Sequence, residues 1–140
     1  MPPSKSEVVP DMMDQAARWM ATFGEVWRTR DTTRVETLFT EGVRYSFDPF
    51  SPPLDLKAVV QHFRMAFAMQ AEVELSMRLV SASANKATIE WWASILTNNN
   101  ASYTLSATML LCLTNDGRVD DLHEHWMRHD GRMPSPERFN

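Results

Sequence analysis

Residues 72–128 read EVELSMRLVSASANKATIEWWASILTNNNASYTLSATMLLCLTNDGRVDDLHEHWMR, a stretch in which apolar and polar residues alternate. A period of two is typical of β-strands that bury one face. Three turn-forming segments divide the stretch: Asn85-Lys86, residues 98–102 and Asn115-Asp116-Gly117, of which the last is a strong hairpin signal. The sequence therefore predicts four long antiparallel strands. Strands of this length twist and coil, so we expect a strongly curved sheet.

The residues before this stretch have the spacing of helices. Asp11 is placed to cap a helix in which apolar residues recur every three or four positions. Thr33 and Glu36 have the spacing of a capping box and predict a short second helix. Asp55 is the predicted N-cap of a third helix. Residues 43–48 alternate again and predict a short strand between the second and third helices.

The order of these elements predicts an α+β fold. It consists of a curved antiparallel sheet, a long four-strand meander plus one short strand, with three N-terminal helices on the concave face. We expect the helices and the sheet to form a cone-shaped pocket with an apolar interior, which is a common kind of ligand site. Residues 11–130 are the single predicted domain, preceded by a mobile tail at 1–10 and followed by a tail at 131–140.

The composition argues against several classes of partner. The net charge is −4 and the pI is near 5.5, whereas nucleic-acid binding requires a basic surface. No apolar run approaches the roughly 18 residues that a membrane span needs. The first residues lack the apolar segment of a secretory signal, and the single Cys112 excludes an internal disulfide. We therefore expect a cytoplasmic protein with no nucleic-acid or membrane partner.

A set of short motifs follows one another in a fixed order. They are the long aromatic first helix, Arg30-Asp31, Leu38-Phe39, residues 45–49, the strand Ala-Thr-Ile-Glu-Trp-Trp-Ala, and Asp-Gly-Arg-Val before a last strand that contains His-Trp. In this order they resemble the nuclear transport factor two-like superfamily, in its SnoaL-like and ketosteroid-isomerase-like branch. The resemblance covers roughly residues 12–131. Members of that superfamily include isomerases, dehydratases, epoxide hydrolases, polyketide cyclases and proteins without catalysis, so the resemblance implies the fold more directly than a reaction.

The resemblance also implies roles for individual residues. Asp48 and the proline after it are similar to the Asp-Pro of ketosteroid isomerases, in which the aspartate is the general base. Trp91 and Trp126 correspond to positions that face the pocket. Phe23 and Met109 stand where those isomerases have the two donors of an oxyanion hole, and neither can donate a hydrogen bond. Steroid isomerisation by the same oxyanion hole is therefore not implied.

Three residues are candidate catalytic groups: Asp48, Glu124 and His62. A carboxylate of Asp48 in an aromatic pocket would have a raised pKa, which suits a general base; alternatively Asp48 is a turn residue bound to the local backbone. Glu124 shares the strand parity of Leu122 and Trp126 and is expected in the pocket, unless a bulge turns it to solvent. His62 either orients Asp48 or acts as an acid, or it is a neutral core residue bonded to a backbone group.

The residues predicted to contact a ligand are mostly aromatic: Trp19, Phe23, Trp27, Tyr45, Phe63, Trp91, Met109 and Trp126. Together with the three candidate catalytic groups they predict a protein that binds a small apolar or polycyclic molecule. The predicted activity is acid–base catalysis without a cofactor, as isomerisation, cyclisation, dehydration or epoxide opening. The alternative is a non-catalytic module of the same fold that binds a ligand or a partner protein. Two or more ionisable groups in the pocket would favour catalysis.

The last strand also carries three histidines, His123, His125 and His129. No second cluster of ligands completes a tetrahedral set with them, so the sequence predicts no metal site.

One predicted sheet face carries apolar residues outside the pocket: Trp92, Leu96, Leu110 and Cys112. An exposed patch of that kind is unusual in a monomer, and members of the superfamily commonly pair through this face. We therefore expect a homodimer through the convex face of the sheet.

Overall fold

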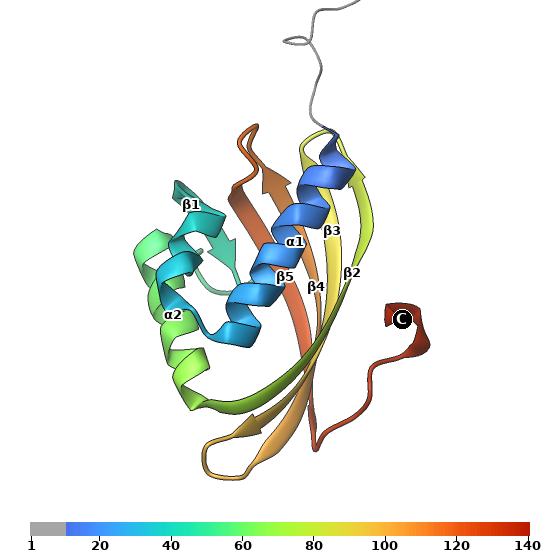
Figure 1. The fold of residues 1–140 in the computed structure, drawn as a ribbon. Coiled ribbons are helices and arrows are strands. Elements are labelled where there is room, and N and C mark those ends of the chain that lie inside the picture. The colour runs from blue at the N-terminus through green and yellow to red at the C-terminus, as the bar shows by residue number, and fades with distance from the viewer. Residues whose placement is uncertain (1–10) are drawn as a thin grey trace, which may run out of the picture.

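The computed structural model describes residues 11–140, and the tail predicted at 1–10 lies outside the described residues. The helical elements are α1 (Met12–Thr29), the 3₁₀ helix η2 (Thr32–Leu38), α2 (Leu56–Met69) and a short 3₁₀ helix η3 (Glu137–Phe139). The strands are β1 (Phe39–Ser46), β2 (Gln70–Ser83), β3 (Lys86–Thr97), β4 (Ser102–Leu113) and β5 (Val119–Asp130). They form one curved sheet, and α1 and α2 lie on one side of it (Figure 1). The predicted α+β fold is confirmed.

The strand order in the sheet is β1-β5-β4-β3-β2. The four long strands pair as the predicted antiparallel meander. The short strand differs from the prediction of an antiparallel sheet, because β1 pairs with β5 in parallel and aligns Tyr45 with Leu122. The connection from β1 to the meander passes through α2, and a crossover of this length can join strands that run in the same direction, which a tight hairpin cannot do. The sheet is therefore mixed.

A bulge in β5 decides which side chains of that strand face the helices. The register between β4 and β5 shifts after Cys112, which leaves Asp120 as the extra residue. An extra residue restores the alternation, so both Val119 and Leu122 are buried although three positions separate them. Glu124 follows in phase with Leu122 and is buried as well. A bulge of this kind was the feature that could have turned Glu124 to solvent, and its position instead keeps the residue inside.

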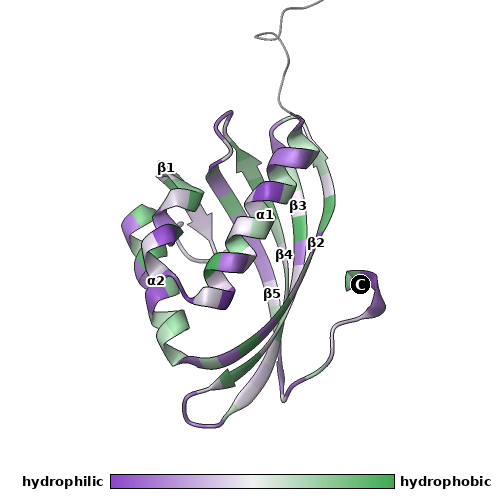
Figure 2. Cartoon of the chain, in the orientation of Figure 1, coloured by the Kyte–Doolittle hydropathy of each residue, from purple (hydrophilic) through white to green (hydrophobic). Residues whose placement is uncertain are grey.

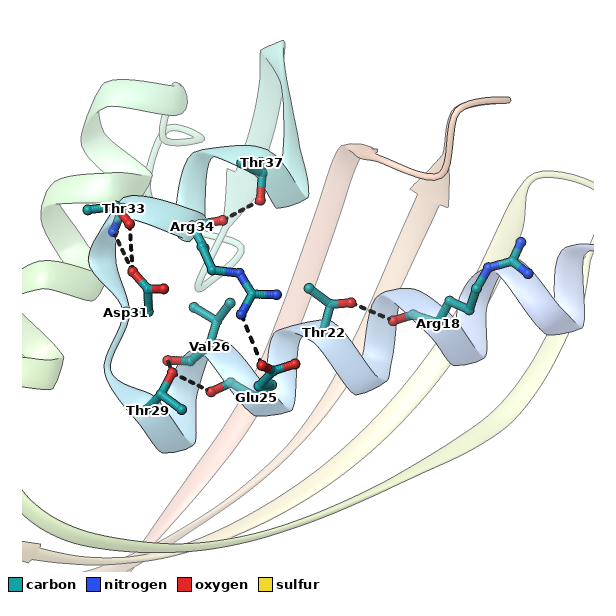
Figure 3. Close-up of polar contacts among 9 residues, drawn as sticks. All are labelled: Arg18, Thr22, Glu25, Val26, Thr29, Asp31, Thr33, Arg34 and Thr37. Atoms are coloured by element: carbon teal, nitrogen blue, oxygen red, sulfur yellow. Dashed lines mark hydrogen bonds and ion pairs between the residues drawn. The ribbon is translucent and has the colours of Figure 1, made fainter.

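Aspartates cap the helices that cover the sheet. Asp11 accepts a hydrogen bond from the backbone N–H of Met13, and Asp55 accepts one from Ala58, as the sequence predicted for both helices. The second helix was predicted to start from a Thr33–Glu36 capping box. It is a 3₁₀ helix whose cap is Asp31, because the Asp31 carboxylate accepts from both the backbone N–H and the hydroxyl of Thr33 (Figure 3).

An ion pair spans the corner between α1 and η2. Arg34 of η2 reaches back to Glu25 of α1 at 3.1 Å (Figure 3). Both side chains are largely exposed, so the pair contributes about 0–1 kcal/mol and the corner depends mainly on buried contacts. One of these contacts is made by Trp19, whose indole N–H donates to the carbonyl of Leu38 at 3.0 Å.

The core lies between the helices and the concave face of the sheet. Aromatic rings from α1 and α2 form a continuous cluster in which Phe23 contacts Trp19, Trp27 and Phe63 edge-on or stacked. Hydrophilic and hydrophobic residues adjoin one another along α1, whereas the turn between β4 and β5 is hydrophilic (Figure 2). The buried residues of α1 and of α2 recur at three- or four-residue spacing, so each helix buries one side, as its sequence predicts. Among residues 11–140, no helix is both long and apolar enough to cross a membrane.

The residues after β5 pack on the convex face of the sheet rather than extending away from it (Figure 1). The carbonyl of Met133 accepts a hydrogen bond from the indole N–H of Trp92 at 2.9 Å. Further along, Arg138 makes two hydrogen bonds of 3.0 and 3.1 Å to the carboxylate of Glu90. This segment covers the Trp92 part of the face that was expected to pair two copies, while Leu110 remains 43% exposed. The homodimer stays a prediction.

Candidate active site

A cavity of about 320 Å³ lies between α1, α2 and the concave face of the sheet. Side chains from both helices and from all five strands line it, so its shape depends on the complete fold. Six of the predicted ligand-contacting residues are in its wall: Phe23, Trp27, Tyr45, Phe63, Trp91 and Trp126. The cavity therefore lies where the sequence predicted a pocket, between the helices and the curved sheet.

Two of the predicted ligand-contacting residues do not line this cavity. Trp19 packs toward η2, because its indole N–H is held by the carbonyl of Leu38 and its ring stacks on Phe23. Met109 is completely buried in the middle of the sheet, where it pairs in register with Ile89 and Glu124. Both have the correct helix or strand parity, but the packing of their neighbours separates them from the open space.

Glu124 is the acid in the cavity wall. The side chain is only 7% exposed, and one carboxylate oxygen accepts a hydrogen bond of 3.0 Å from the hydroxyl of Tyr45. Burial raises the pKa of Glu124 to about 7, because desolvation disfavours the charged form more than the hydrogen bond from Tyr45 favours it. A carboxyl group with this pKa is present in both the protonated and the charged form near neutral pH.

Tyr45 is the hydrogen-bond donor to Glu124. The parallel pairing of β1 with β5 places the two residues next to each other, although 79 positions separate them in the sequence. The side chain is completely buried between Phe39 and Phe47. Burial, together with the charge of Glu124, raises the pKa of the Tyr45 hydroxyl well above its ordinary value. Tyr45 therefore remains protonated and acts as a donor at every physiological pH.

Two further polar groups of the cavity wall have unused hydrogen-bonding capacity. The indole N–H of Trp91 is close enough to Glu124 to lower the pKa of that carboxyl, but it makes no hydrogen bond of good geometry with any described residue. Gln70 uses its side-chain oxygen to accept from the indole N–H of Trp27 at 2.9 Å, which leaves its NH₂ group as a donor. Both groups suit a ligand with an oxygen acceptor.

His62 lies on the outer part of the cavity wall. Its ring packs against Phe47 with 4.0 Å between the ring centroids, while the rest of the side chain is exposed. Partial burial lowers the pKa of His62 below its ordinary value. The imidazole is therefore mostly neutral at pH 7 and can exchange protons with solvent.

Asp48 does not join this group. It is absent from the cavity wall, and its carboxylate accepts a hydrogen bond of 2.8 Å from the backbone N–H of Phe50. That hydrogen bond, with a smaller contribution from the Ser51 hydroxyl, lowers the pKa of Asp48. The expected convergence of Asp48 with Glu124 and His62 is therefore wrong for Asp48. The residue is a turn aspartate bound to the local backbone, which was the alternative that the sequence left open.

Several residues of the cavity wall were not among the predicted site residues, and the most important are Arg128 and Gln70. Arg128 has the same strand parity as Glu124 and Trp126, so alternation alone was sufficient to place it on the concave face. Gln70 lies at the junction of α2 and β2, where neither the helical nor the strand period applies. No pattern in the sequence identified it.

Among residues 11–140, no three His, Cys, Asp or Glu side chains are grouped so that they could hold a metal ion. His123 instead lies 3.3 Å from Asp121 on the same strand, and both side chains are substantially exposed.

Comparison with known proteins agrees with the fold. A family model described as the SnoaL-like domain matches residues 17–122. Comparison with the curated proteins gave no match.

Two solved structures are similar to this chain over most of its length. One is the epoxide hydrolase/cyclase-like enzyme SalBIII, described with a role in pyran ring formation in the polyether salinomycin. It has a TM-score of 0.73 and 16% identity, and the match covers 86% of this chain and 98% of SalBIII. The other is a conserved protein from Planctomyces limnophilus DSM 3776, with a TM-score of 0.70 and 11% identity over 82% of this chain and 95% of that protein. At these identities the similarity is one of fold.

Proposed function

Because the chain belongs to the SnoaL-like domain family, we propose that it binds a small apolar molecule in the cavity and moves a proton on it with Glu124. The proposal rests on one feature of the cavity wall. A buried carboxyl group with a pKa of about 7 lies in an otherwise aromatic cavity, with Tyr45 as its hydrogen-bond donor. Perturbed carboxyl groups in apolar cavities are typical of acid–base sites.

The cavity wall indicates the size and polarity of the ligand. Ligand sites commonly have volumes of about 300–1,000 Å³, and this cavity is at the lower end of that range. Aromatic rings such as Phe23, Phe63 and Trp91 form most of its wall and favour a flat apolar body. We therefore expect a ligand of one or two rings.

The carboxyl group of Glu124 can donate or accept a proton, and this chemistry requires no cofactor. In a cyclisation, the acid gives its proton to an epoxide oxygen as the C–O bond breaks. A hydroxyl group of the same molecule attacks the carbon, and its proton then returns to the carboxylate, so that the cycle closes. The description of SalBIII as epoxide hydrolase/cyclase-like favours this reaction class, while isomerisation uses the same group as a base and then as an acid.

Tyr45 and His62 have supporting roles in this proposal. Tyr45 holds one carboxylate oxygen of Glu124 and so fixes the direction in which the other oxygen can act. His62 is neutral near pH 7 and stands between the cavity and solvent, where it can exchange a proton with water while the ligand is bound.

A small planar probe can test Glu124 as a base before the natural substrate is identified. In 5-nitrobenzisoxazole, removal of the ring C–H proton breaks the N–O bond and gives a coloured cyanophenolate, with the proton left on the base. Only the carboxylate form of Glu124 can accept this proton. We expect the protein to accelerate the reaction with a rate that rises with pH and becomes constant above about 7. Absorbance of the phenolate measures the rate.

The background rate is measured in buffer with an equal concentration of acetate, which supplies a carboxylate in water. A protein rate equal to this background across the pH range would contradict the proposed role of Glu124. A rate that already levels near pH 5 would show a carboxylate of ordinary pKa and would contradict the burial argument.

Replacing Tyr45 by Phe removes the hydrogen bond to Glu124 and keeps the ring. That hydrogen bond lowers the pKa of Glu124, so its loss should raise the midpoint of the pH profile above about 7. A hydrogen bond to a charged group is worth about 1.5–3 kcal/mol, so the midpoint should move upward by about one unit or more. The matched control is Tyr103→Phe, because Tyr103 also lines the cavity but makes no hydrogen bond to Glu124. Equal midpoints for the two variants would show that Tyr45 does not act on the acid.

A further inference from the structure

The cavity has a second charged group, far from Glu124. Arg128 lies in its wall, four residues further along β5 and on the same face of the sheet. Four residues of a strand span about 13 Å, so the acid and the arginine mark opposite ends of the cavity. Glu124 is buried, whereas 53% of the Arg128 side chain is exposed, which places Arg128 at the mouth.

The neighbours of Arg128 hold its guanidinium group but leave its hydrogen-bonding edge available. The guanidinium carbon is 4.2 Å from the centroid of the Tyr103 ring, a contact that uses the flat face of the group. The nearest carboxylate is that of Asp130, at 3.6 Å and 94% exposed. A pair of this kind contributes little and is easily exchanged. The N–H donors of a guanidinium lie in its plane. Stacking of its flat face on Tyr103 therefore orients the N–H donors and leaves them available for other hydrogen bonds.

Arg128 is also the single lysine or arginine in the cavity wall among the described residues. The other lining residues are mostly aromatic, including Tyr103 under the guanidinium group, so Arg128 is the permanently charged partner that this wall offers to an anion. An apolar ligand would leave this cation at the mouth with only the exposed carboxylate of Asp130 as a partner. A ligand that carries an anionic group at one end would pair with it.

The deep end of the cavity requires a different group. The indole N–H of Trp91 belongs to a residue that is only 3% exposed, and among residues 11–140 it makes no hydrogen bond of good geometry. A buried N–H group without an acceptor destabilises the folded protein. A ligand oxygen at that position would accept the hydrogen bond and remove this cost. The same oxygen would lie beside Glu124, whose carboxyl group the N–H of Trp91 also approaches.

We propose that the natural ligand is a monocarboxylate: an apolar body of one or two rings with its carboxylate on Arg128 at the mouth and an oxygen acceptor beside Trp91 and Glu124 at the deep end. This inference rests on the proposed function and specifies its substrate class. The planar fork of an arginine matches a carboxylate with two parallel hydrogen bonds. A phosphate monoester carries a charge of about −1.5 to −2, and one cation next to Asp130 would neutralise it incompletely.

The test uses two probes of nearly identical shape, 2-naphthoate and 2-naphthamide, titrated into the full chain by isothermal calorimetry. Both bodies suit the aromatic wall, and only the acid can pair with Arg128. We expect the wild type to bind the naphthoate about tenfold more tightly than the amide. Arg128→Gln should bring the two affinities to within about twofold while the affinity for the amide stays the same. Arg128→Lys should keep part of the preference, because it retains the charge without the fork.

The matched control is Arg64→Gln, which removes an exposed arginine of α2 that is not in the cavity wall. This variant should keep the tenfold preference. Equal binding of both probes to the wild type would overturn the carboxylate inference and leave the proposed function standing. A preference that survives in Arg128→Gln would also overturn it, because another group would then hold the anion. Failure of both probes to bind would overturn the proposed function and this inference together.

Discussion

Replacing Glu124 by Gln should lower the rate of 5-nitrobenzisoxazole opening about 10²–10⁴-fold, which is the usual contribution of a general base. Glutamine has almost the same shape, and its side-chain oxygen can still accept the hydrogen bond from Tyr45. The cavity should therefore keep its form and bind 2-naphthamide as the wild type does. Absorbance gives the rate and calorimetry gives the affinity, so a loss of catalysis is separated from a loss of binding.

Asp48→Asn is the matched comparison for this variant. The resemblance to ketosteroid isomerases predicts that Asp48 is the base, whereas the structure has its carboxylate on the backbone of Phe50 outside the cavity. We expect Asp48→Asn to keep the wild-type rate. If Asp48→Asn loses the activity and Glu124→Gln retains it, the assignment of the base to Glu124 is wrong.

The same Glu124→Gln change should make the protein more stable at alkaline pH. The pKa of Glu124 is raised from 4.5 to about 7, so the folded state holds this proton while the unfolded state releases it near pH 4.5. The resulting stability is complete below about pH 4.5 and is lost as the pH rises through about 7. A difference of about 2.5 pH units corresponds to roughly 3 kcal/mol. At pH 8.5 the variant should therefore exceed the wild type by about 3 kcal/mol, or about 10 °C in Tm.

At pH 4 the two proteins should be almost equally stable, because Glu124 is then neutral in both the folded and the unfolded state. Thermal or urea unfolding followed by circular dichroism at both pH values measures the difference. Glu41→Gln, at an exposed position of β1, should not reproduce the pH-dependent gain. If Glu124→Gln is no more stable than the wild type at pH 8.5, the carboxyl is better solvated than its burial indicates.

Local pattern was sufficient for most of the fold. Alternation located β2 to β5, and cap residues such as Asp11 and Asp55 located the starts of α1 and α2, because these features depend on near neighbours in the chain. The parallel pairing of β1 with β5 was missed, since no local period reports which distant strand becomes a neighbour. The packing of the last residues against Trp92 was missed for the same reason.

The site was predictable where strand parity controls it and unpredictable where turn geometry controls it. Parity placed Glu124, Trp126 and Trp91 on the concave face, and the structure has all three in the cavity wall. The prediction that Asp48 faces the cavity failed, because the carboxylate of a turn aspartate reaches the backbone two residues away more easily than a distant cavity. The partnership of Tyr45 with Glu124 needed the register of β1 on β5, which only the complete sheet defines.

The pairing of the first strand with the last has a consequence for how the protein is made. The helices and the three hairpins of the meander join near neighbours in the chain, so they can form early in folding. The contact of Tyr45 with Glu124 closes a loop of 79 positions, whose entropic cost must be met before any of its contacts stabilise the chain. We therefore expect the docking of β1 to be a late event. A chain that leaves the ribosome with its meander already paired has a sheet but lacks the contact of Tyr45 with Glu124, and it acquires that contact only when β1 docks on β5.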